Sequence, residues 1–350
     1  MKTDGIRNIP TYFPNMDLVR YVLAFAVFFS HIEFLAGIEM WFPLSSYDAV
    51  GGFFALSGFL MYHSYTKHHS FLRYTTQRAR RILPPYVFIV VLCAFGLLFL
   101  SDLPPAVYLG SAGLWEYLGA NLAFLNWLQP YLPGVFEGAG NVAPDVNGSL
   151  WTMKVEWCLY FSVPIFVWLL GLSFGRKRRR IGKSSLALMV IAISIVYRLV
   201  FYILWLQTRN PIYDLLGRQI FSQLAFFYCG MYIYFRREWF MRHNLLMLLL
   251  GVVLYIVGSA GPIPMILFTP VGLSVLVMSL SFIPKDIAVL RHRGNISYEI
   301  YLFHWPVIQT TVSLGLLQFG STAFCAITIA ATVLLSLVFS VLWRRCLRSH

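Results

Sequence analysis

Arg20 and His31 lie eleven residues apart in an otherwise apolar stretch, MDLVRYVLAFAVFFSH. In a helix this spacing is just over three turns, so both side chains fall on one face, about 16 Å apart along the axis. Asp17 stands one turn before Arg20 and can pair with it. Ionisable groups inside lipid cost about 3 kcal/mol or more and usually mark function. A purely structural explanation also exists, in which Arg20 reaches the lipid headgroups and His31 bonds a neighbouring helix.

Two other apolar stretches carry ionisable side chains. Residues 147–160, NGSLWTMKVEWCLY, begin with Asn147 or Ser149 as a helix cap and place Glu156 about 10 Å into the helix. Residues 295–306, NISYEIYLFHWP, carry His304 near mid-depth, with a kink expected at Pro306. We therefore expect His31, Glu156 and His304 to lie at compatible depths and to supply the catalytic groups.

A cluster of arginines precedes another apolar stretch. Arg78, Arg80 and Arg81 lead directly into ILPPY, where Pro84 and Pro85 allow a helix to begin or to kink. Guanidinium groups bind phosphate in a bidentate manner, so the cluster predicts a site for a phosphorylated cytosolic cofactor. A basic stop-transfer segment is the structural alternative.

The longest polar segment, 102–148, combines aromatic rings and carboxylates with many Gly and Pro residues. Aromatic faces pack on sugar rings and carboxylates accept hydrogen bonds from hydroxyls, so this mixture suits carbohydrate. An aromatic belt at the membrane interface is the structural alternative, although a loop of this length is usually functional. The candidate substrate-binding residues, in this loop and on the two polar helices, are Glu137, Asp145, Trp151 and Tyr298.

The composition indicates the elements that must position these residues. Of the 350 residues, 59% are hydrophobic and 12% are charged, whereas soluble proteins have about 25% charged residues. The sequence therefore predicts an all-α polytopic membrane protein with one domain over residues 1–350. The first apolar stretch is too long for a signal-peptide core and no A-x-A-like site follows it, so we expect it to stay as a helix.

Ten apolar runs are long enough to cross a bilayer, at about 20 residues each. They cover 17–37, 48–66, 82–101, 149–170, 184–206, 215–235, 244–260, 263–283, 295–315 and 321–343. The shorter apolar stretch near 114–128, within the 102–148 loop, is expected to form an interfacial or re-entrant helix.

Lys and Arg gather in alternate loops. They are abundant in the N-terminus and in 67–81, 176–183, 236–242, 285–293 and 344–348, and absent from 38–47 and 102–148; Arg209 and Arg218 are exceptions. The positive-inside rule then predicts that both termini are cytoplasmic. The net charge of +13 is thus explained by topology, with anionic lipid as a partner and no role for nucleic acid.

The remaining reactive residues do not form recognisable sites. No cysteine pair has metal or disulfide spacing, so the cysteines are expected to act as small apolar residues. His63, His68 and His69 lack an accompanying carboxylate, and no metal site is expected. Neither a Gly-x-Ser-x-Gly elbow nor a P-loop is present.

Five motifs follow one another along nearly the whole chain. They are Arg20-x10-His31, Gly52-Phe-Phe-x-Leu-Ser-Gly-Phe59, Arg78-Ala-Arg80-Arg81, Ser149-Leu-Trp-Thr-x-x-x-Glu156-x-x-x-Tyr160 and Ser297-Tyr-x-Ile-Tyr-Leu-x-His304-Trp-Pro306. In this order the motifs resemble those of the acyltransferase family 3 membrane proteins.

The resemblance implies a ten-helix bundle in the bacterial inner membrane. It implies transfer of an acyl group, usually acetyl from acetyl-CoA as co-substrate, to a hydroxyl of an extracytoplasmic or lipid-linked glycan such as O-antigen or exopolysaccharide. Arg20 and His31 map to the family's essential first-helix pair, and Arg78 and Arg81 to its Arg-x-x-Arg motif. We assign Arg20, Arg78, Arg80 and Arg81 to binding of acyl-CoA, without a metal.

Several roles stay open within this scheme. His31 would act as a general base, which we favour, or would carry the acyl group itself. Glu156 would orient His31 or bind a sugar hydroxyl, and His304 would stabilise an oxyanion or serve in packing. Gly51 and Gly58 would allow close helix approach or leave room for an acyl or pantetheine chain.

The sequence departs from the family pattern at two places. Gly52 stands where the second helix often has an acidic or polar residue, and Tyr21 stands where many first helices have Gly. No SGNH esterase-like domain is appended, so a single-chain transfer is expected.

Two functions other than acyl transfer are compatible with the sequence. Intramembrane His and Glu would suit the proton relay of a glycan or lipid transporter or flippase, although no repeat relates the two halves of the chain. A structural partner in a glycan assembly complex is the weaker alternative. Neither the acceptor nor the oligomeric state is predicted.

Overall fold

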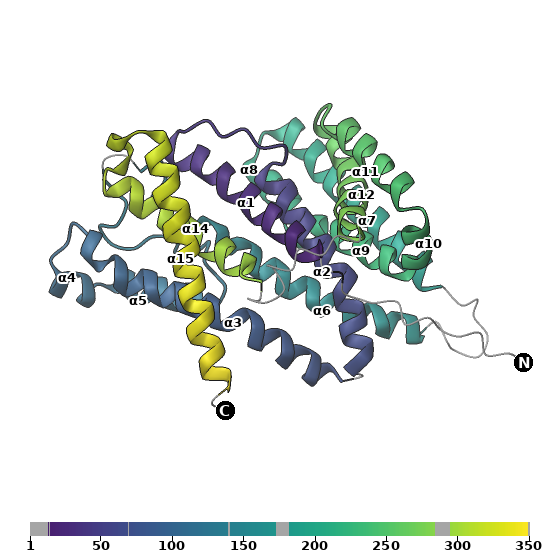
Figure 1. Ribbon diagram of the computed structural model, residues 1–350, viewed down its shortest axis with the longest axis horizontal. Helices are drawn as coiled ribbons and strands as arrows, with labels where there is room; N and C mark the ends of the chain where they lie inside the picture. The colour runs from purple at the N-terminus through teal and green to yellow at the C-terminus, as the bar shows by residue number, and fades with distance from the viewer. Residues whose placement is uncertain are drawn as a thin grey trace, which may run out of the picture. The chain divides into compact units, whose positions relative to one another are not determined.

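The computed structural model describes residues 13, 15–68, 70–138, 141–172, 182–283 and 295–348. All regular elements in these ranges are helices, with no strand among them, so the predicted all-α class is confirmed (Figure 1). The basic residues expected to set the orientation in the N-terminus, in 176–180 and in 285–293 lie outside the described ranges, as does His69.

Each of the ten apolar runs coincides with a helix. These helices are α1 (Asn15–Ala36), α2 (Ser46–His68), α3 (Phe71–Gly96), α6 (Trp151–Leu172), α7 (Lys183–Thr208), α9 (Ile220–Phe235), α11 (Asn244–Gly258), α12 (Pro262–Ser281), α14 (Ser297–Ser313) and α15 (Ser321–Arg348). Shorter helices are α4 (Pro105–Gly110), α5 (Ala112–Leu122), α8 (Pro211–Gly217) and α10 (Arg237–Arg242).

Six helical segments in the described ranges are long and apolar enough to cross a membrane. They are Asn15–Ala36, Phe71–Leu100, Gly148–Gly171, Lys183–Thr208, Pro262–Ser281 and Ser321–Cys346. The helices α9, α11 and α14 have 16, 15 and 17 residues, and 17 residues reach only about 26 Å of a core about 30 Å thick. The helix α2 is long enough, but it carries Asp48, His63 and Lys67.

The helix α3 begins earlier than the sequence predicts. Residues 71–81 were expected in a basic loop, but α3 starts at Phe71 and continues through Pro84 and Pro85. Each proline removes one backbone amide donor and leaves the other hydrogen bonds of the helix intact, so a long helix can contain both prolines. The arginines at 78–81 are therefore fixed on helical turns.

The interfacial helix ends before the predicted boundary at 128. The Ser111 side chain accepts a hydrogen bond from the amide of Leu114 and caps the start of α5. The helix ends at Leu122, and Phe124 has a φ of +61°, which is a left-handed conformation that a right-handed helix cannot contain.

The described residues belong to two compact units, each assembled from separate parts of the chain. The first unit comprises Met1–Arg20, Gly51–Phe71 and Trp157–Arg293. Within it α11 and α12 lie side by side (Figure 1). A Cβ at Gly251 would lie 2.7 Å from the amide nitrogen of Leu276, so the missing side chain lets the two helices approach closely.

Glycine serves the same purpose where α2 meets α9 in this unit. A Cβ at Gly58 would overlap the carbonyl oxygen of Phe227, and a Cβ at Gly230 would overlap that of Ala55. A Cβ at Gly51 would lie 2.7 Å from the ring of Phe226. Of the two roles open for Gly51 and Gly58, the contacts of the described residues therefore favour close helix packing.

The second unit comprises Tyr21–Val50, Leu72–Glu156 and Gly294–His350. Within it α14 lies against α15, where Thr328 donates to Thr311 over 3.1 Å. Phe88 of α3 packs against Phe303 of α14 and Phe339 of α15, with ring centroids 5.8 and 4.7 Å away. His31, Glu156 and His304 all lie in this unit.

Candidate active site

The two predicted catalytic histidines meet directly. Nδ1 of His31 on α1 lies 2.7 Å from Nε2 of His304 on α14. The ring planes differ by 5° and the centroids are 5.0 Å apart. With nitrogen atoms in contact at that centroid distance, the rings meet edge to edge in a common plane and are not stacked face to face. The contact has the geometry of a good hydrogen bond.

The second contact of His304 determines which nitrogen carries each proton. Nδ1 of His304 lies 3.2 Å from the carbonyl oxygen of Ile300. A carbonyl can only accept, so this nitrogen is the donor and Nε2 of the neutral ring is the acceptor. It follows that Nδ1 of His31 is protonated and that Nε2 of neutral His31 carries a lone pair. No hydrogen-bond partner for this Nε2 is found in the described parts of the chain.

Aromatic side chains surround the histidine pair. His304 is fully buried, and the rings of Phe28 and Tyr301 lie 5.5 and 5.9 Å from it, centroid to centroid. The indole of Trp305 contacts His31 edge to face, at 4.7 Å and an interplanar angle of 73°. These contacts restrict the rotation of both imidazoles.

Glu156 is near this group without bonding to His31. Its charge acts on the hydroxyl of Tyr301, which lies 2.8 Å from Oγ1 of Thr152 and 3.3 Å from the carbonyl oxygen of Ser149. Among the described residues, His31 makes no hydrogen bond to Glu156. Tyr301 therefore interacts with both groups: the charge of Glu156 acts on its hydroxyl, and its ring packs on His304.

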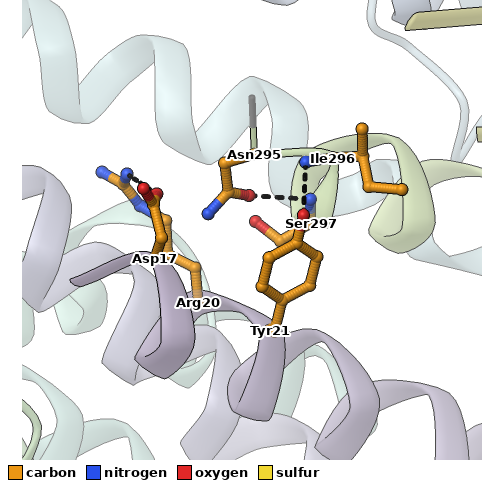
Figure 2. Close-up of polar contacts among 6 residues, drawn as sticks. All are labelled: Asp17, Arg20, Tyr21, Asn295, Ile296 and Ser297. Carbon is orange, nitrogen blue, oxygen red and sulfur yellow. Dashed lines mark hydrogen bonds and ion pairs between the residues drawn. The ribbon is translucent and has the colours of Figure 1, made fainter. Parts of the chain in front are cut away.

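Tyr21 joins α1 and α14 at a second point. Its hydroxyl accepts a hydrogen bond from the amide of Ile296 over 3.1 Å, just before α14 begins (Figure 2). Asn295 accepts from the amide of Ser297 over 2.8 Å and satisfies another free donor of the same turn. The residue that departs from the family pattern thus helps to place the helix that carries His304.

The predicted pairing of Asp17 with Arg20 is confirmed. A guanidinium nitrogen of Arg20 lies 3.5 Å from a carboxylate oxygen of Asp17, one turn earlier on α1 (Figure 2). Arg20 is nearly buried, at 9% exposure, so its charge needs such a counter-ion.

The three other predicted donor-binding arginines lie on α3. Arg78 is half-buried, and Arg80 and Arg81 are exposed. At 100° per residue, Arg78 and Arg81 share a face and Arg80 lies on the other side of the helix. Arg81 and Arg344 of α15 act electrostatically on Glu299, a half-buried residue in the first turn of α14.

The predicted substrate-binding residues are dispersed. Trp151 is half-buried at the start of α6, and the hydroxyl of Tyr298 donates to the carbonyl oxygen of Ile82 on α3 over 3.3 Å. Glu137 is exposed, and its carboxylate accepts from the amide of Gly134 over 3.2 Å, which closes a turn. Of these four residues, Asp145 is connected to the histidine pair, because its main chain bonds Trp305 and Trp305 contacts His31.

The main-chain carbonyl of Asp145 is hydrogen-bonded, and its carboxyl group is half-buried. Its carbonyl oxygen accepts from the indole nitrogen of Trp305 over 3.0 Å. Burial raises the pKa of its side chain above the usual value, because removal from water disfavours the charged form. The contact of Trp305 with His31 therefore connects this part of the outer loop to the site.

Sequence reasoning did not single out Tyr301, Trp305 or Ile300 as site residues. Trp305 follows His304 directly and Tyr301 precedes it by three residues. Their closeness to His304 in the sequence is the signal that could have identified them. The role of Ile300 depends on its main-chain carbonyl, which its residue type does not reveal. No group of three or more His, Cys, Asp or Glu side chains in the described ranges could hold a metal ion.

Comparisons with known proteins agree with the motifs. No curated protein and no solved structure matches the chain significantly. A family model described as an acyltransferase domain, Acyl_transf_3, matches residues 13–341. This match covers nearly the whole chain, including the helices that carry His31, Glu156 and His304, and the protein therefore belongs to acyltransferase family 3, a family of membrane acyltransferases.

Proposed function

We propose that this protein is an O-acyltransferase with ten membrane spans in the bacterial inner membrane. It moves an acyl group, acetyl from acetyl-CoA, to a hydroxyl of an extracytoplasmic or lipid-linked glycan such as O-antigen or exopolysaccharide. The observation that carries the proposal is the bond between His31 and His304, because it leaves a lone pair on Nε2 of His31. Family membership supports acyl transfer in general.

The histidine pair is suited to general-base catalysis. Nε2 of His31 takes the proton of the acceptor hydroxyl as its oxygen attacks the thioester carbonyl carbon. The tetrahedral intermediate collapses, the C–S bond breaks, and the CoA sulfur receives the proton from Nε2. The net reaction converts an alcohol and an acyl thioester into an ester and free CoA. While His31 carries the extra proton, Nε2 of His304 accepts from its Nδ1 and stabilises the cation.

The donor and acceptor are assigned to opposite ends of the second unit's helices. Arg78 and Arg81 bind the CoA phosphates on the cytoplasmic side, since guanidinium groups suit phosphate. Glu156 and Asp145 accept hydrogen bonds from sugar hydroxyls, and Tyr301 interacts with both Glu156 and His304. The aromatic residues of the outer loop provide faces for sugar rings.

The test uses purified protein in liposomes with radiolabelled acetyl-CoA and de-O-acylated surface polysaccharide of the host bacterium. Wild-type protein should label the polysaccharide. The His31→Ala variant should lose this transfer by a factor of about 10² to 10⁴, the usual contribution of a general base, with unchanged expression. Retained activity in His31→Ala would refute the mechanism, and polysaccharide that crosses the bilayer unlabelled would indicate a transporter.

His304→Phe separates the role of the pair from that of His31 alone. Phenylalanine fills the space of the imidazole but cannot accept the proton of His31 Nδ1. Transfer should fall at least about tenfold in kcat with KM for acetyl-CoA unchanged, because only the orientation and charge of His31 are affected. Label that accumulates on wild-type protein in the absence of polysaccharide would instead assign the acyl-carrier role to Nε2 of His31.

A further inference from the structure

The outer-loop residues 141–148, here called the outer segment, are hydrogen-bonded along one side of α14. Asn141 bonds Gln309, the main chain of residues 143 and 145 accepts from Gln309, and Asn147 donates to the carbonyl oxygen of Leu302 over 2.9 Å. The segment therefore lies beside the same helix that carries His304, across about two turns.

Gln309 is the centre of these contacts. It is fully buried, and Nε2 of its amide donates to the carbonyl oxygens of Ala143 and Asp145 over 2.6 and 3.1 Å. Its Oε1 accepts from Nδ2 of Asn141 over 2.7 Å. The opposite orientation of the amide would place its oxygen against two carbonyl oxygens, so the bonds define one arrangement. Every hydrogen-bonding atom of this amide serves to hold the outer segment.

Trp305 extends this arrangement to the histidines. It stands one turn before Gln309, and its indole nitrogen donates to the same carbonyl oxygen of Asp145. The indole also contacts His31 at 4.7 Å between centroids. A Cβ at Gly148 would lie 2.6 Å from two carbon atoms of the indole, so the absence of a side chain there leaves the space in which Trp305 lies.

We propose that Gln309 and Trp305 are positioning residues, which hold the outer segment as the acceptor-side wall of the site and hold His31 in the orientation for proton transfer. The inference rests on the proposed function in naming the acceptor. Neither residue touches a reacting atom. Gln309 fixes the outer segment, the outer segment fixes the indole nitrogen of Trp305, and the indole restricts the imidazole of His31.

Three substitutions disturb this chain of contacts at different points. Gln309→Met keeps the length of the side chain and removes its hydrogen bonds. Trp305→Phe keeps an aromatic ring and removes the indole donor, and Gly148→Ala displaces the indole without removing a polar group. Ser313→Ala is the matched control, because Ser313 also bonds Asn141, over 2.8 Å, but at the exposed end of the outer segment and away from Trp305.

Two measurements distinguish positioning from a general effect on folding. The first is acetyl transfer to de-O-acylated polysaccharide in proteoliposomes, for which the three variants should show at least a tenfold loss of kcat/KM for polysaccharide and an unchanged KM for acetyl-CoA. The second is the rate at which diethylpyrocarbonate modifies His31, identified by peptide mass spectrometry. That rate should change at least threefold in the variants, because the reagent attacks the unprotonated Nε2, and should stay at the wild-type value in Ser313→Ala.

The outcomes separate this inference from the proposed function. If the folded variants keep both values within twofold of wild type, the positioning role is refuted. If wild-type protein acylates no polysaccharide, the proposed acceptor is refuted, and the modification rate of His31 still decides whether Gln309 and Trp305 position it. Equal loss of donor and acceptor binding with an unchanged modification rate would reduce both residues to a packing role and overturn the inference.

Discussion

At the scale of single residues, the clustered arginines of α3 look equivalent in the sequence but lie on different faces of the helix. Arg78 and Arg81 lie about 60° apart around the helix, whereas Arg80 lies about 160° from Arg78. Arg81 also acts on the half-buried Glu299 of α14, together with Arg344. A rigid phosphate group can bridge two guanidinium groups on one face, so Arg78 and Arg81 are the better donor-binding pair.

This division predicts different effects for two neighbouring substitutions. Arg81→Ala should raise the Kd for CoA at least about tenfold, because a hydrogen bond to a charged group contributes about 1.5–3 kcal/mol. Arg80→Ala, the matched control one residue earlier, should stay within twofold of wild type. Titration calorimetry with CoA in detergent measures both values. An equal effect of the two substitutions would show that net charge, and not the Arg78–Arg81 face, holds the donor.

The helices themselves follow from the sequence, but their pairing does not. Apolar runs of about 20 residues predict most of the long helices to within about five residues, because burial of apolar surface and backbone bonding depend on local composition. The exception is α3, which begins at Phe71 and not at residue 82. The bond between His31 and His304 joins residues far apart in the chain, and no spacing rule gives their contact. The sequence predicts only that the two histidines lie at compatible depths. Their contact and their tautomers follow from the structure, the tautomers from the carbonyl of Ile300.

Residue type also failed to predict some helix boundaries and main-chain contacts. Pro84 and Pro85 predict a helix start or a kink, whereas α3 starts at Phe71 and continues through both prolines. Phe124 ends α5 early with a left-handed backbone, although its residue type rarely adopts one. The role of Gln309 was missed because its partners are main-chain atoms of the outer segment.

At the scale of elements, the contact of α2 with α9 predicts a loss of stability. In Gly58→Ala the new methyl group would overlap the carbonyl oxygen of Phe227, a backbone atom that cannot move as a side chain does. The free energy of unfolding should fall by about 1–3 kcal/mol, as for other overpacked sites. Thermal unfolding in detergent measures the change.

Gly171→Ala is the control for this contact within the same unit. Nothing lies within 4 Å of a Cβ at Gly171 on α6, so the substitution should leave stability unchanged or raise it by up to about 1 kcal/mol, because alanine favours a helix over glycine. If Gly58→Ala unfolds at the same temperature as Gly171→Ala, α2 and α9 do not meet through Gly58.

At the scale of the whole molecule, the number of spans decides which side of the membrane holds the arginines of α3. With ten spans and a cytoplasmic N-terminus, two helices precede residues 67–81, which then lie in the cytoplasm with the acyl-CoA. With only the six segments that are long and apolar enough to cross a membrane as spans, α1 alone precedes α3. The same residues then lie outside and 102–148 lies inside. The two arrangements place the donor arginines on opposite sides.

Single cysteines report this difference in spheroplasts. We expect Ala106→Cys, an exposed position on α4, to react with a membrane-impermeant maleimide in intact spheroplasts. Thr76→Cys, an exposed position on α3, should react only after permeabilisation. Both are made in a Cys346→Ser background, because Cys346 is the exposed native cysteine among those described, and that background alone gives the baseline. The reversed pattern would refute ten spans with a cytoplasmic N-terminus and would exclude Arg78 and Arg81 from binding cytosolic acyl-CoA, whatever their effect on activity.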